Sequence, residues 1–236
     1  MSADDRIAAL FSSIAPAYDG LNRLFSLASD LRWRRTLARL AATVPGARVI
    51  DVCTGTADLA VELVRSGAAK QVVGLDLSVG MLRRGHRKVG KAALAHAVTL
   101  LRADALSLPF PDGSFDAACS AFGLRNIRDR ARAVGEMARV TRAGGKVLVL
   151  EFAPPRRGAG LALYSAYLRR VIPFVGGIVS GRPDAYRHLR DSIASFLDPG
   201  EMTALLRASG LEGVRAVRLT AGIAYLYRAR KPGGRP

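Results

Sequence analysis

Residues 49–59 read Val49-Ile50-Asp51-Val52-Cys53-Thr54-Gly55-Thr56-Ala57-Asp58-Leu59. Apolar and β-branched residues lead into a turn of small residues, and Asp58 then opens a stretch with the apolar spacing of a helix. A strand, a tight turn and a helix N-terminus direct backbone N–H groups and the positive end of the helix dipole toward a ligand. Small residues after a strand also let a helix pack closely against it, so this turn needs a second signal before it indicates a binding site.

A second apolar run supplies that signal. Residues 71–75 are followed by Asp76, which stands 21 residues after Gly55. An acid at the tip of the next strand is the position from which nucleotide-binding α/β proteins hold ribose hydroxyls. The turn and the acid together predict a site for a ligand that carries a nucleoside.

The residues of the turn separate two classes of nucleotide-binding protein. A dinucleotide loop of the Gly-x-Gly-x-x-Gly type needs three glycines. Here Cys53 and Ala57 occupy positions at which variants of such a loop carry small residues other than glycine. Asp51, two residues before Cys53, can accept a hydrogen bond from the amine of an amino-acid moiety. S-adenosylmethionine carries such an amine and NAD does not, so the pattern favours a methyltransferase over a dehydrogenase.

Length and composition fit a single α/β domain of 236 residues, half of them hydrophobic. No run approaches the ~20 apolar residues of a membrane span, and the start of the chain lacks the apolar region of a secretory signal. Cys53 and Cys119 have neither metal-ligand nor redox spacing, so we expect two reduced thiols in a cytosolic protein and no metal site.

The formal net charge of +17 raises the question of an anionic partner. Nucleic acid, an anionic membrane surface and simple solubility are all compatible with it. The basic residues are spread over many segments of the chain. Charge alone therefore selects none of the three.

Alternating apolar strands and helical stretches predict a mostly parallel sheet covered on both faces. The N-terminal segment from Ile7 to Leu40 has helical spacing, and we expect residues 15–19, which include Pro16, to break it into at least two helices that cap the open end of the sheet or pack as an arm. The expected strands are 48–53, 71–76, 98–101, 115–120 and 145–151, the expected helices are 57–65, 79–91, 130–140, 184–196 and 199–208, and an antiparallel edge is expected from 214–219 and 222–227.

Two further strand ends carry polar residues. Asp104 can accept from an adenine amino group and Ala105 can offer its backbone N–H, although Asp104 could equally cap the turn. After the fourth strand, Arg125 and Asn126 could bind an oxygen of a small phenolic substrate, with a surface salt bridge as the alternative for Arg125. The Asn- or Asp-Pro-Pro-aromatic motif of enzymes that methylate nucleobase amines is absent, and no proline precedes Cys119 as in cytosine-C5 enzymes.

These stretches resemble one family over nearly the whole chain. It is the UbiE/MenG (COQ5-like) family of quinone-biosynthesis C-methyltransferases, which use S-adenosylmethionine to methylate a polyprenylated quinol. The Phe-Gly-Leu-Arg-Asn motif is much more specific than the first loop, which is common to many methyltransferases. The matching stretches are Phe11–Asn22, Asp51–Asp58, Phe122–Asn126, Leu148–Phe152, Tyr186–Ile193 and Leu219–Ala224.

The resemblance implies a Rossmann-like class I methyltransferase fold, with a mostly parallel seven-stranded sheet, a helical N-terminal cap and an antiparallel C-terminal β-pair. We expect one domain over residues 1–236, divided into a cap (1–45), a cofactor-binding core (46–152) and substrate-side helices with closing strands (153–230). Thr56, Asp76, Asp104 and Ala105 fall on the family's cofactor positions, to which our own interpretation adds Asp51 and Gly55. Ala121 replaces a serine that the family often has before its Phe-Gly motif.

Cys53 resembles the menaquinone branch more than the Gly-Gly loop of ubiquinone-type enzymes. The favoured reaction is therefore methylation of demethylmenaquinol to menaquinol, and the alternative is methylation of 2-methoxy-6-polyprenyl-1,4-benzoquinol in ubiquinone biosynthesis. A candidate from another class is a basic RNA-binding methyltransferase or a non-catalytic module. The missing amine-type motif counts against it, and no nucleic-acid partner is expected.

A quinol ring carbon becomes a good nucleophile once a ring hydroxyl has lost its proton, and free phenols have a pKa near 10. Arg125 and Asn126 are the candidates for holding that oxygen or an ordered water. Tyr186 and His188 are secondary catalytic candidates on the substrate side, because a neutral histidine can act as a base near pH 7.

The segment Leu161–Val179 is mostly apolar but contains Arg169, Arg170 and Pro173. It could form an amphipathic lid that touches an anionic membrane surface and admits the prenyl tail, or a helix that packs in the core. We expect a cytoplasmic protein that reaches the inner face of the cytoplasmic membrane peripherally. The oligomeric state stays open between a monomer and a homodimer.

Overall fold

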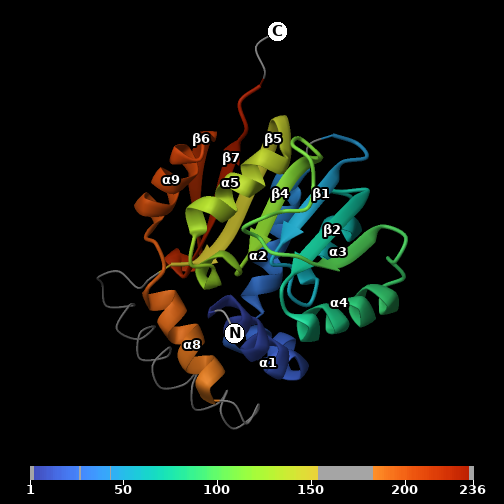
Figure 1. Ribbon diagram of the computed structural model, residues 1–236, viewed down its shortest axis with the longest axis vertical. Helices are drawn as coiled ribbons and strands as arrows, with labels where there is room; N and C mark the ends of the chain where they lie inside the picture. The colour runs from blue at the N-terminus through green and yellow to red at the C-terminus, as the bar shows by residue number, and fades with distance from the viewer. Residues whose placement is uncertain (1–2, 27, 43, 154–182, 234–236) are drawn as a thin grey trace.

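A computed structural model describes residues 3–26, 28–42, 44–153 and 183–233 (Figure 1). The expected lid at Leu161–Val179 lies outside these residues. Seven strands form one sheet in the order β3-β2-β1-β4-β5-β7-β6. The strands are β1 (Arg48–Val52), β2 (Gln71–Asp76), β3 (Val98–Arg102), β4 (Phe115–Ala121), β5 (Thr141–Phe152), β6 (Glu212–Leu219) and β7 (Ala224–Arg230).

The pairing of the strands confirms the expected fold class. Strands β1 to β5 are joined by parallel pairing, whereas β7 pairs antiparallel with both β5 and β6. The strand order reverses between β1 and β4, and such a switch point opens a crevice at the carboxyl ends of the strands. β5 begins at Thr141 rather than at residue 145, and its pairing with β4 shifts register between Phe115 and Ala117.

Helices cover both faces of the sheet and bury a separate apolar core on each side. One core takes residues from α2 (Ser29–Ala41), α3 (Asp58–Arg65) and α4 (Val79–Lys91), and the other takes residues from α5 (Arg130–Val140) and α9 (Pro199–Ala208). Both faces of the parallel strands are therefore apolar, which explains their near-continuous hydrophobic sequence.

The N-terminal prediction was wrong about where the helix breaks. Helix α1 (Ala3–Phe25) runs through Pro16 without interruption, and the break falls after Phe25 and before Ser29, where Ala28 has φ 58°. Proline removes one helical N–H and crowds the carbonyl of Ser12. Here Ser12 Oγ is 2.8 Å from Ser78 Oγ, and Ile14 and Ala15 are buried, so tertiary contacts hold the helix together.

Helices α1 and α8 (Pro183–Ala194) lie at the end of the sheet where the parallel strands terminate (Figure 1). α1 packs along α4 and also touches α8. The cap of the open end that the sequence suggested is therefore present as α1, lying over the crevice.

Candidate functional site

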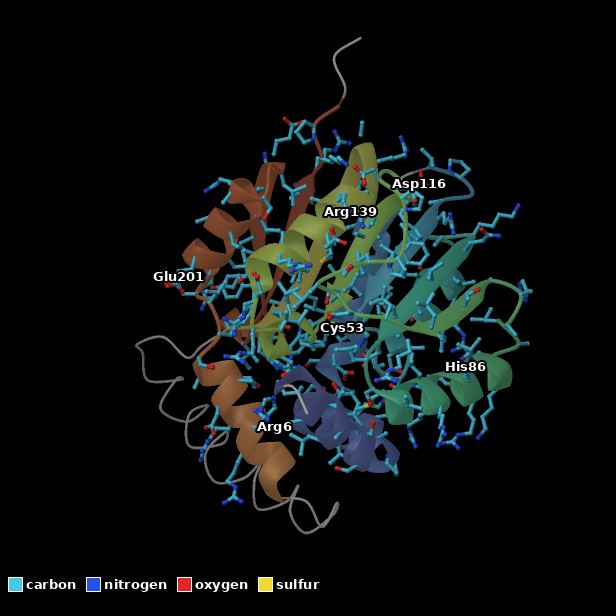
Figure 2. All side chains as sticks on the ribbon, viewed as in Figure 1. Arg6, Cys53, His86, Asp116, Arg139 and Glu201 are labelled. Atoms are coloured by element: carbon cyan, nitrogen blue, oxygen red, sulfur yellow. The ribbon has the colours of Figure 1, made fainter. Side chains whose placement is uncertain are left out.

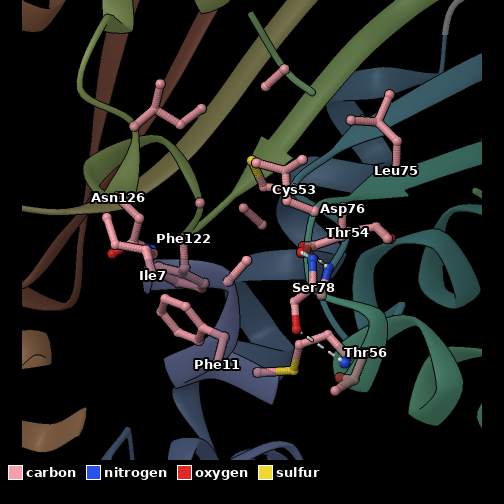
Figure 3. Close-up of a pocket in the computed structure, with 18 of the residues that line it drawn as sticks. Ile7, Phe11, Cys53, Thr54, Thr56, Leu75, Asp76, Ser78, Phe122 and Asn126 are labelled. Carbon is pink, nitrogen blue, oxygen red and sulfur yellow. Dashed lines mark hydrogen bonds between the residues drawn. The ribbon is translucent and has the colours of Figure 1, made fainter. Parts of the chain in front are cut away.

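A cavity lies between α1 and the carboxyl ends of β1, β2, β3 and β4 (Figure 3). Ile7 and Phe11 of α1 lie beside Phe122 and Asn126, whereas Asp76 lies on the other side of the view with the β1 loop. The wall is mostly apolar near α1 and polar at the strand ends. The cavity therefore joins a region suited to a ring with one suited to a nucleoside.

The loop after β1 holds an unusual backbone. Cys53, Gly55 and Ala57 have φ angles of 59°, 56° and 65°, and Figure 2 places Cys53 near the middle of the molecule. Left-handed backbone costs a non-glycine residue about 1–2 kcal/mol. Packing and the hydrogen bond from Thr54 N to Leu75 O at 2.9 Å hold the turn in place. Strain of this kind, maintained at a strand-to-helix turn, is typical of ligand sites.

Gly123 approaches the same loop from the end of β4. A Cβ on Gly123 would lie 2.3 Å from the Cβ of Cys53, so this position has no room for a side chain. Phe122, the residue before it, has φ 63°, and the centre of its ring lies 4.6 Å from that of Phe152, with the two rings tilted by 32°. The two loops thus pack closely against each other and form one wall of the cavity.

Asp76 at the tip of β2 organises the nucleoside side. Its Oδ2 accepts from Gly55 N at 2.9 Å, and its Oδ1 accepts from Ser78 N at 2.8 Å. Burial raises the pKa of Asp76, and these backbone hydrogen bonds oppose that shift. A carboxylate oxygen accepts more than one hydrogen bond, so Asp76 can bind a pair of hydroxyls while it holds the loop.

Thr56 links the β1 loop to the N-terminal helix. Its Oγ1 donates to Asp19 Oδ1 at 2.6 Å and accepts from Lys88 Nζ at 2.9 Å. Arg84 and Lys88 of α4 also pair with Asp19, at 3.1 and 2.9 Å. Burial raises the pKa of Asp19, but the hydrogen bonds from Thr56, Lys88 and Arg84 outweigh it, and the net pKa lies below the usual value of 3.8. A buried carboxylate therefore ties three elements together at the cavity.

Asp51 is a fully buried acid just behind the cavity wall. Its Oδ2 accepts from Thr54 Oγ1 at 2.6 Å, but its Oδ1 has no hydrogen-bond partner among the described residues. Burial raises its pKa to about 7, against the hydrogen bond from Thr54 and the charge of Arg34. Asp51 is not among the described residues that line the cavity, and its direct contact with a ligand stays a prediction.

Arg34 is a cavity residue that the motif analysis did not assign. It is buried, makes a 2.6 Å ion pair with Asp30 and lies 5.1 Å from the centre of the Phe122 ring. The sequence held a signal for it, because Trp33 stands among Arg32, Arg34 and Arg35 in a segment whose apolar residues have helical spacing. Of these arginines, Arg34 is the one on the buried face of α2, and it lines the cavity.

Asp104 and Ala105 both line the cavity after β3. Asp104 is exposed, and its Oδ1 accepts from Leu106 N at 2.9 Å, so it does cap the turn. The capping role and a place on the cavity wall are therefore compatible in this residue.

Arg125 turns toward the protein interior rather than toward the cavity. Its Nη1 lies 3.0 Å from Glu151 Oε2, its backbone N donates to Glu151 Oε1 at 3.1 Å, and Nη1 also donates to the Phe122 carbonyl. The two side chains are 2% and 0% exposed. The salt bridge is therefore buried rather than on the surface, and a direct substrate contact of Arg125 stays a prediction.

Asn126 lines the cavity and meets a residue from a distant helix. Its Oδ1 is 3.1 Å from Nε2 of His188 in α8, and the His188 ring stands at a right-angled contact of 6.1 Å with Phe11. Burial lowers the pKa of His188, and the charge of Arg125 adds to that effect. Tyr186 belongs to the same helix, and its side chain lies outside the described residues.

The described residues contain no group of three or more His, Cys, Asp or Glu side chains arranged to hold a metal ion. No helix within the described part of the chain is long and apolar enough to cross a membrane.

A Rossmann-like sheet, an acid at the tip of β2 and a cavity over the switch point define a nucleotide-binding site of the open α/β class. A solved structure of a SAM-dependent methyltransferase from Aquifex aeolicus has the same fold, with a TM-score of 0.61 and 18% identity, over 84% of this chain and 88% of that one. Residues 1–231 match the model of the ubiE/COQ5 methyltransferase family, and this chain belongs to that family.

Two relatives resemble the chain over most of its length. A protein of Thermus thermophilus named demethylmenaquinone methyltransferase is 45% identical over 223 residues, which are 94% of this chain and 100% of that protein. A protein of Geobacter sulfurreducens named ubiquinone/menaquinone biosynthesis C-methyltransferase UbiE is 40% identical, over 96% of this chain and 89% of that protein. The family resemblance drawn from the motifs is thereby confirmed.

Proposed function

We propose that this chain transfers a methyl group from S-adenosylmethionine to a ring carbon of a polyprenylated quinol, with demethylmenaquinol as the favoured substrate. One observation carries the proposal: a single cavity has the carboxylates Asp76 and Asp104 at one side and Asn126, bonded to His188, at the other. The relative named demethylmenaquinone methyltransferase supports the choice of quinol. The benzoquinol of ubiquinone biosynthesis is the second candidate, because other relatives are named for both quinones.

The polar side of the cavity fits S-adenosylmethionine. Asp76 would hold the ribose hydroxyls, and Asp104 with Ala105 would meet the adenine. Arg34 would face the carboxylate of the methionine part, since it is the buried cation on the cavity wall. The unpartnered oxygen of Asp51 behind that wall supplies the negative charge that an amine and a sulfonium favour.

S-adenosylmethionine supplies an electrophilic methyl group when it is bound. The protein must then align a ring carbon with that methyl and exclude water from it. Ile7, Phe11 and Phe122 form the apolar wall against which a flat quinol ring packs. Phe11 and Phe122 lie on one side of the cavity and Asp76 on the other (Figure 3), so the ring and the nucleoside would occupy different parts of it.

His188 is the proposed general base. If Asn126 Oδ1 accepts from the Nε2–H of His188, the lone pair is on Nδ1, which can take the proton of a quinol hydroxyl. The phenolate then pushes electrons to the ring carbon that accepts the methyl group. That carbon afterwards releases its hydrogen to water as a proton, and the imidazolium returns its proton to the ring oxygen. The balance is one proton released to solvent for each methyl transferred.

Arg125 acts in this scheme through its neighbours. Its ion pair with Glu151 fixes the backbone that carries Asn126, and its positive charge helps to keep His188 neutral. It is a positioning residue in this proposal, which revises the substrate contact expected from the sequence. Tyr186 is retained as a second substrate-side candidate because it lies in the same helix as His188.

The test is methyl transfer from labelled S-adenosylmethionine, with the product identified by mass spectrometry. Demethylmenaquinol and 2-methoxy-6-polyprenyl-1,4-benzoquinol are offered separately, each as the quinol and as the oxidised quinone. We expect the naphthoquinol to be methylated faster than the benzoquinol, and neither oxidised form to react, because a quinone has no hydroxyl to deprotonate. Equal turnover of both redox forms would exclude the phenolate mechanism, and transfer to neither quinol would overturn the function.

A further inference from the structure

Helix α4 has a strongly cationic outer face. Its thirteen residues include no Asp or Glu, and Arg83, Arg87 and Lys91 are all exposed. They stand four residues apart, so they form one stripe about 12 Å long along the helix. Figure 2 shows His86 of the same helix at the edge of the molecule.

The stripe differs from the other cations of the same helix. Arg84 and Lys88 face α1 and pair with Asp19. In contrast, Arg83, Arg87 and Lys91 form no ion pair with any described residue. Like charges four residues apart repel each other on a helix, so an anionic partner would reduce this electrostatic repulsion.

An exposed apolar side chain continues the stripe at its cavity end. Val79, four residues before Arg83, is 40% exposed and is one of the few large hydrophobic residues on the described surface. Ser78 before it and Met81 after it both line the cavity. The stripe therefore begins beside the wall of the cavity, and Val79, its one apolar residue, is at that end.

We propose that the α4 face formed by Val79, Arg83, Arg87 and Lys91 docks the protein on an anionic bilayer surface. The arginines and the lysine would meet lipid phosphates, and Val79 would enter the headgroup region. This inference rests on the proposed function, because a polyprenylated quinol is a lipid that must reach the cavity from a bilayer. Docking by α4 places α1, which packs along α4 (Figure 1) and lines the cavity, beside that surface. RNA is the competing polyanion. The bilayer is favoured because the prenyl tail of the proposed substrate is apolar and would lie next to the cavity.

The experiment measures binding to large vesicles of pure phosphatidylcholine and of phosphatidylcholine with phosphatidylglycerol, by flotation. The test variant is R83Q/R87Q/K91Q. The matched control is R207Q/R215Q/R228Q, which removes the same charge from three exposed arginines of α9, β6 and β7. In Figure 1 these elements lie away from α4.

We expect the α4 variant to lose binding to anionic vesicles on the order of 100-fold, since each basic residue near such a surface contributes about five-fold. The control should change by less than about 5-fold, and ~1 M salt should abolish binding of the wild type. Arg87→Gln alone should lose about five-fold, and it serves if the triple variant is unfolded by circular dichroism. Val79→Ala should lose about 3- to 10-fold.

An equal loss in both triple variants would reduce the effect to net charge and overturn the proposal, as would unchanged binding of the α4 variant. Tighter binding of a single-stranded RNA than of vesicles at the same salt, lost in the α4 variant, would assign the stripe to nucleic acid instead. Methylation of a short-tailed, water-soluble quinol separates the two proposals. Wild type and α4 variant should turn it over equally, whereas no turnover by either would refute the function and leave the vesicle result to stand alone.

Discussion

The carboxylate of Asp19 accepts a 2.6 Å hydrogen bond from Oγ1 of Thr56, and this contact joins the N-terminal helix to the loop after β1. Lys88 bonds to both residues from α4. The part of the chain that covers the cavity and the part that would hold the methyl donor are therefore fastened at one point. We expect changes at this point to alter ligand binding as well as stability.

Asp19→Ala should raise the Kd for S-adenosylmethionine by about 10-fold or more, since a hydrogen bond to a charged group contributes ~1.5–3 kcal/mol. Calorimetry measures the affinity. The control is Asp112→Ala, which removes an exposed ion-pair partner of Arg139 outside the cavity. A Kd that stays at the wild-type value in folded Asp19→Ala would show that the contact is only structural. Because the pKa of Asp19 is lowered, its contribution to stability is present above 3.8 and is lost as the pH falls below that value.

Asp76→Ala should weaken S-adenosylmethionine binding by ~1–3 kcal/mol while the fold persists. The structure adds a reason for the loss, because Asp76 also holds the backbone N–H groups of Gly55 and Ser78. Asp104→Ala should have a smaller effect, since Asp104 is exposed. An unchanged affinity in folded Asp76→Ala, measured by the same calorimetry, would remove Asp76 from the cofactor site.

Binding of S-adenosylmethionine should release a fraction of a proton near pH 7. The pKa of Asp51 is raised to about 7, and a bound cation would lower it again. The Kd should therefore fall as the pH rises from about 6 to 8, and Asp51→Asn should abolish this dependence. Calorimetry in buffers of different ionisation enthalpy measures the proton directly.

The same acid should affect the stability of the ligand-free protein. A raised pKa means that the stabilising contribution of Asp51 is present below 3.8 and is lost as the pH rises through about 7. Asp51→Asn should accordingly have a higher Tm than the wild type at pH 8 and nearly the same Tm at pH 4. The opposite order of Tm at pH 8 would show that the carboxylate is stabilised rather than strained.

His188→Gln should lower kcat by about 10²–10⁴, the range for loss of a general base, without changing cofactor affinity. The pKa of His188 lies below 6.5, so wild-type kcat should fall as the pH drops through that lower value. This acid limb of the pH profile of kcat should be absent in the variant. His96→Gln, an exposed histidine, is the control. A wild-type pH profile in His188→Gln would transfer the base role to another residue.

Arg125→Ala leaves Glu151 buried without its partner, which should cost about 3–5 kcal/mol of stability. The paired replacement R125M/E151L avoids that buried charge and isolates the catalytic question. If Arg125 is a positioning residue, this variant should raise the pH of the acid limb, because the cation that lowers the pKa of His188 is gone. If Arg125 instead stabilises the phenolate directly, the highest kcat in the pH profile should also fall about 10²–10³-fold.

The order and boundaries of the core elements were largely predictable, because buried parallel strands and amphipathic helices each have a characteristic spacing of hydrophobic residues in the sequence. α4 has the limits expected for it, and β2 does also. Pro16 misled the prediction because the contacts that hold α1 together come from Ser78, 62 residues away. Local signals cannot report such support.

The candidate site was predictable where its residues directly follow strands in the sequence. Asp76 and Gly55 were both found from the strand ends, and they do bond to each other. Pairs that meet only in space were missed. Nothing in the sequence links Arg125 to Glu151, Thr56 to Asp19, or Asn126 to His188, since each pair joins different elements.

The 2.3 Å approach of a Cβ on Gly123 to Cys53 has a consequence for how this chain can evolve. Positions 53 and 123 together have room for one side chain, so the residue at one position limits which substitutions are possible at the other. A descendant that exchanges Cys53 for glycine would gain freedom at position 123 and lose backbone strain at φ 59°. As long as the cysteine stays, every neutral path that places a side chain at position 123 is closed.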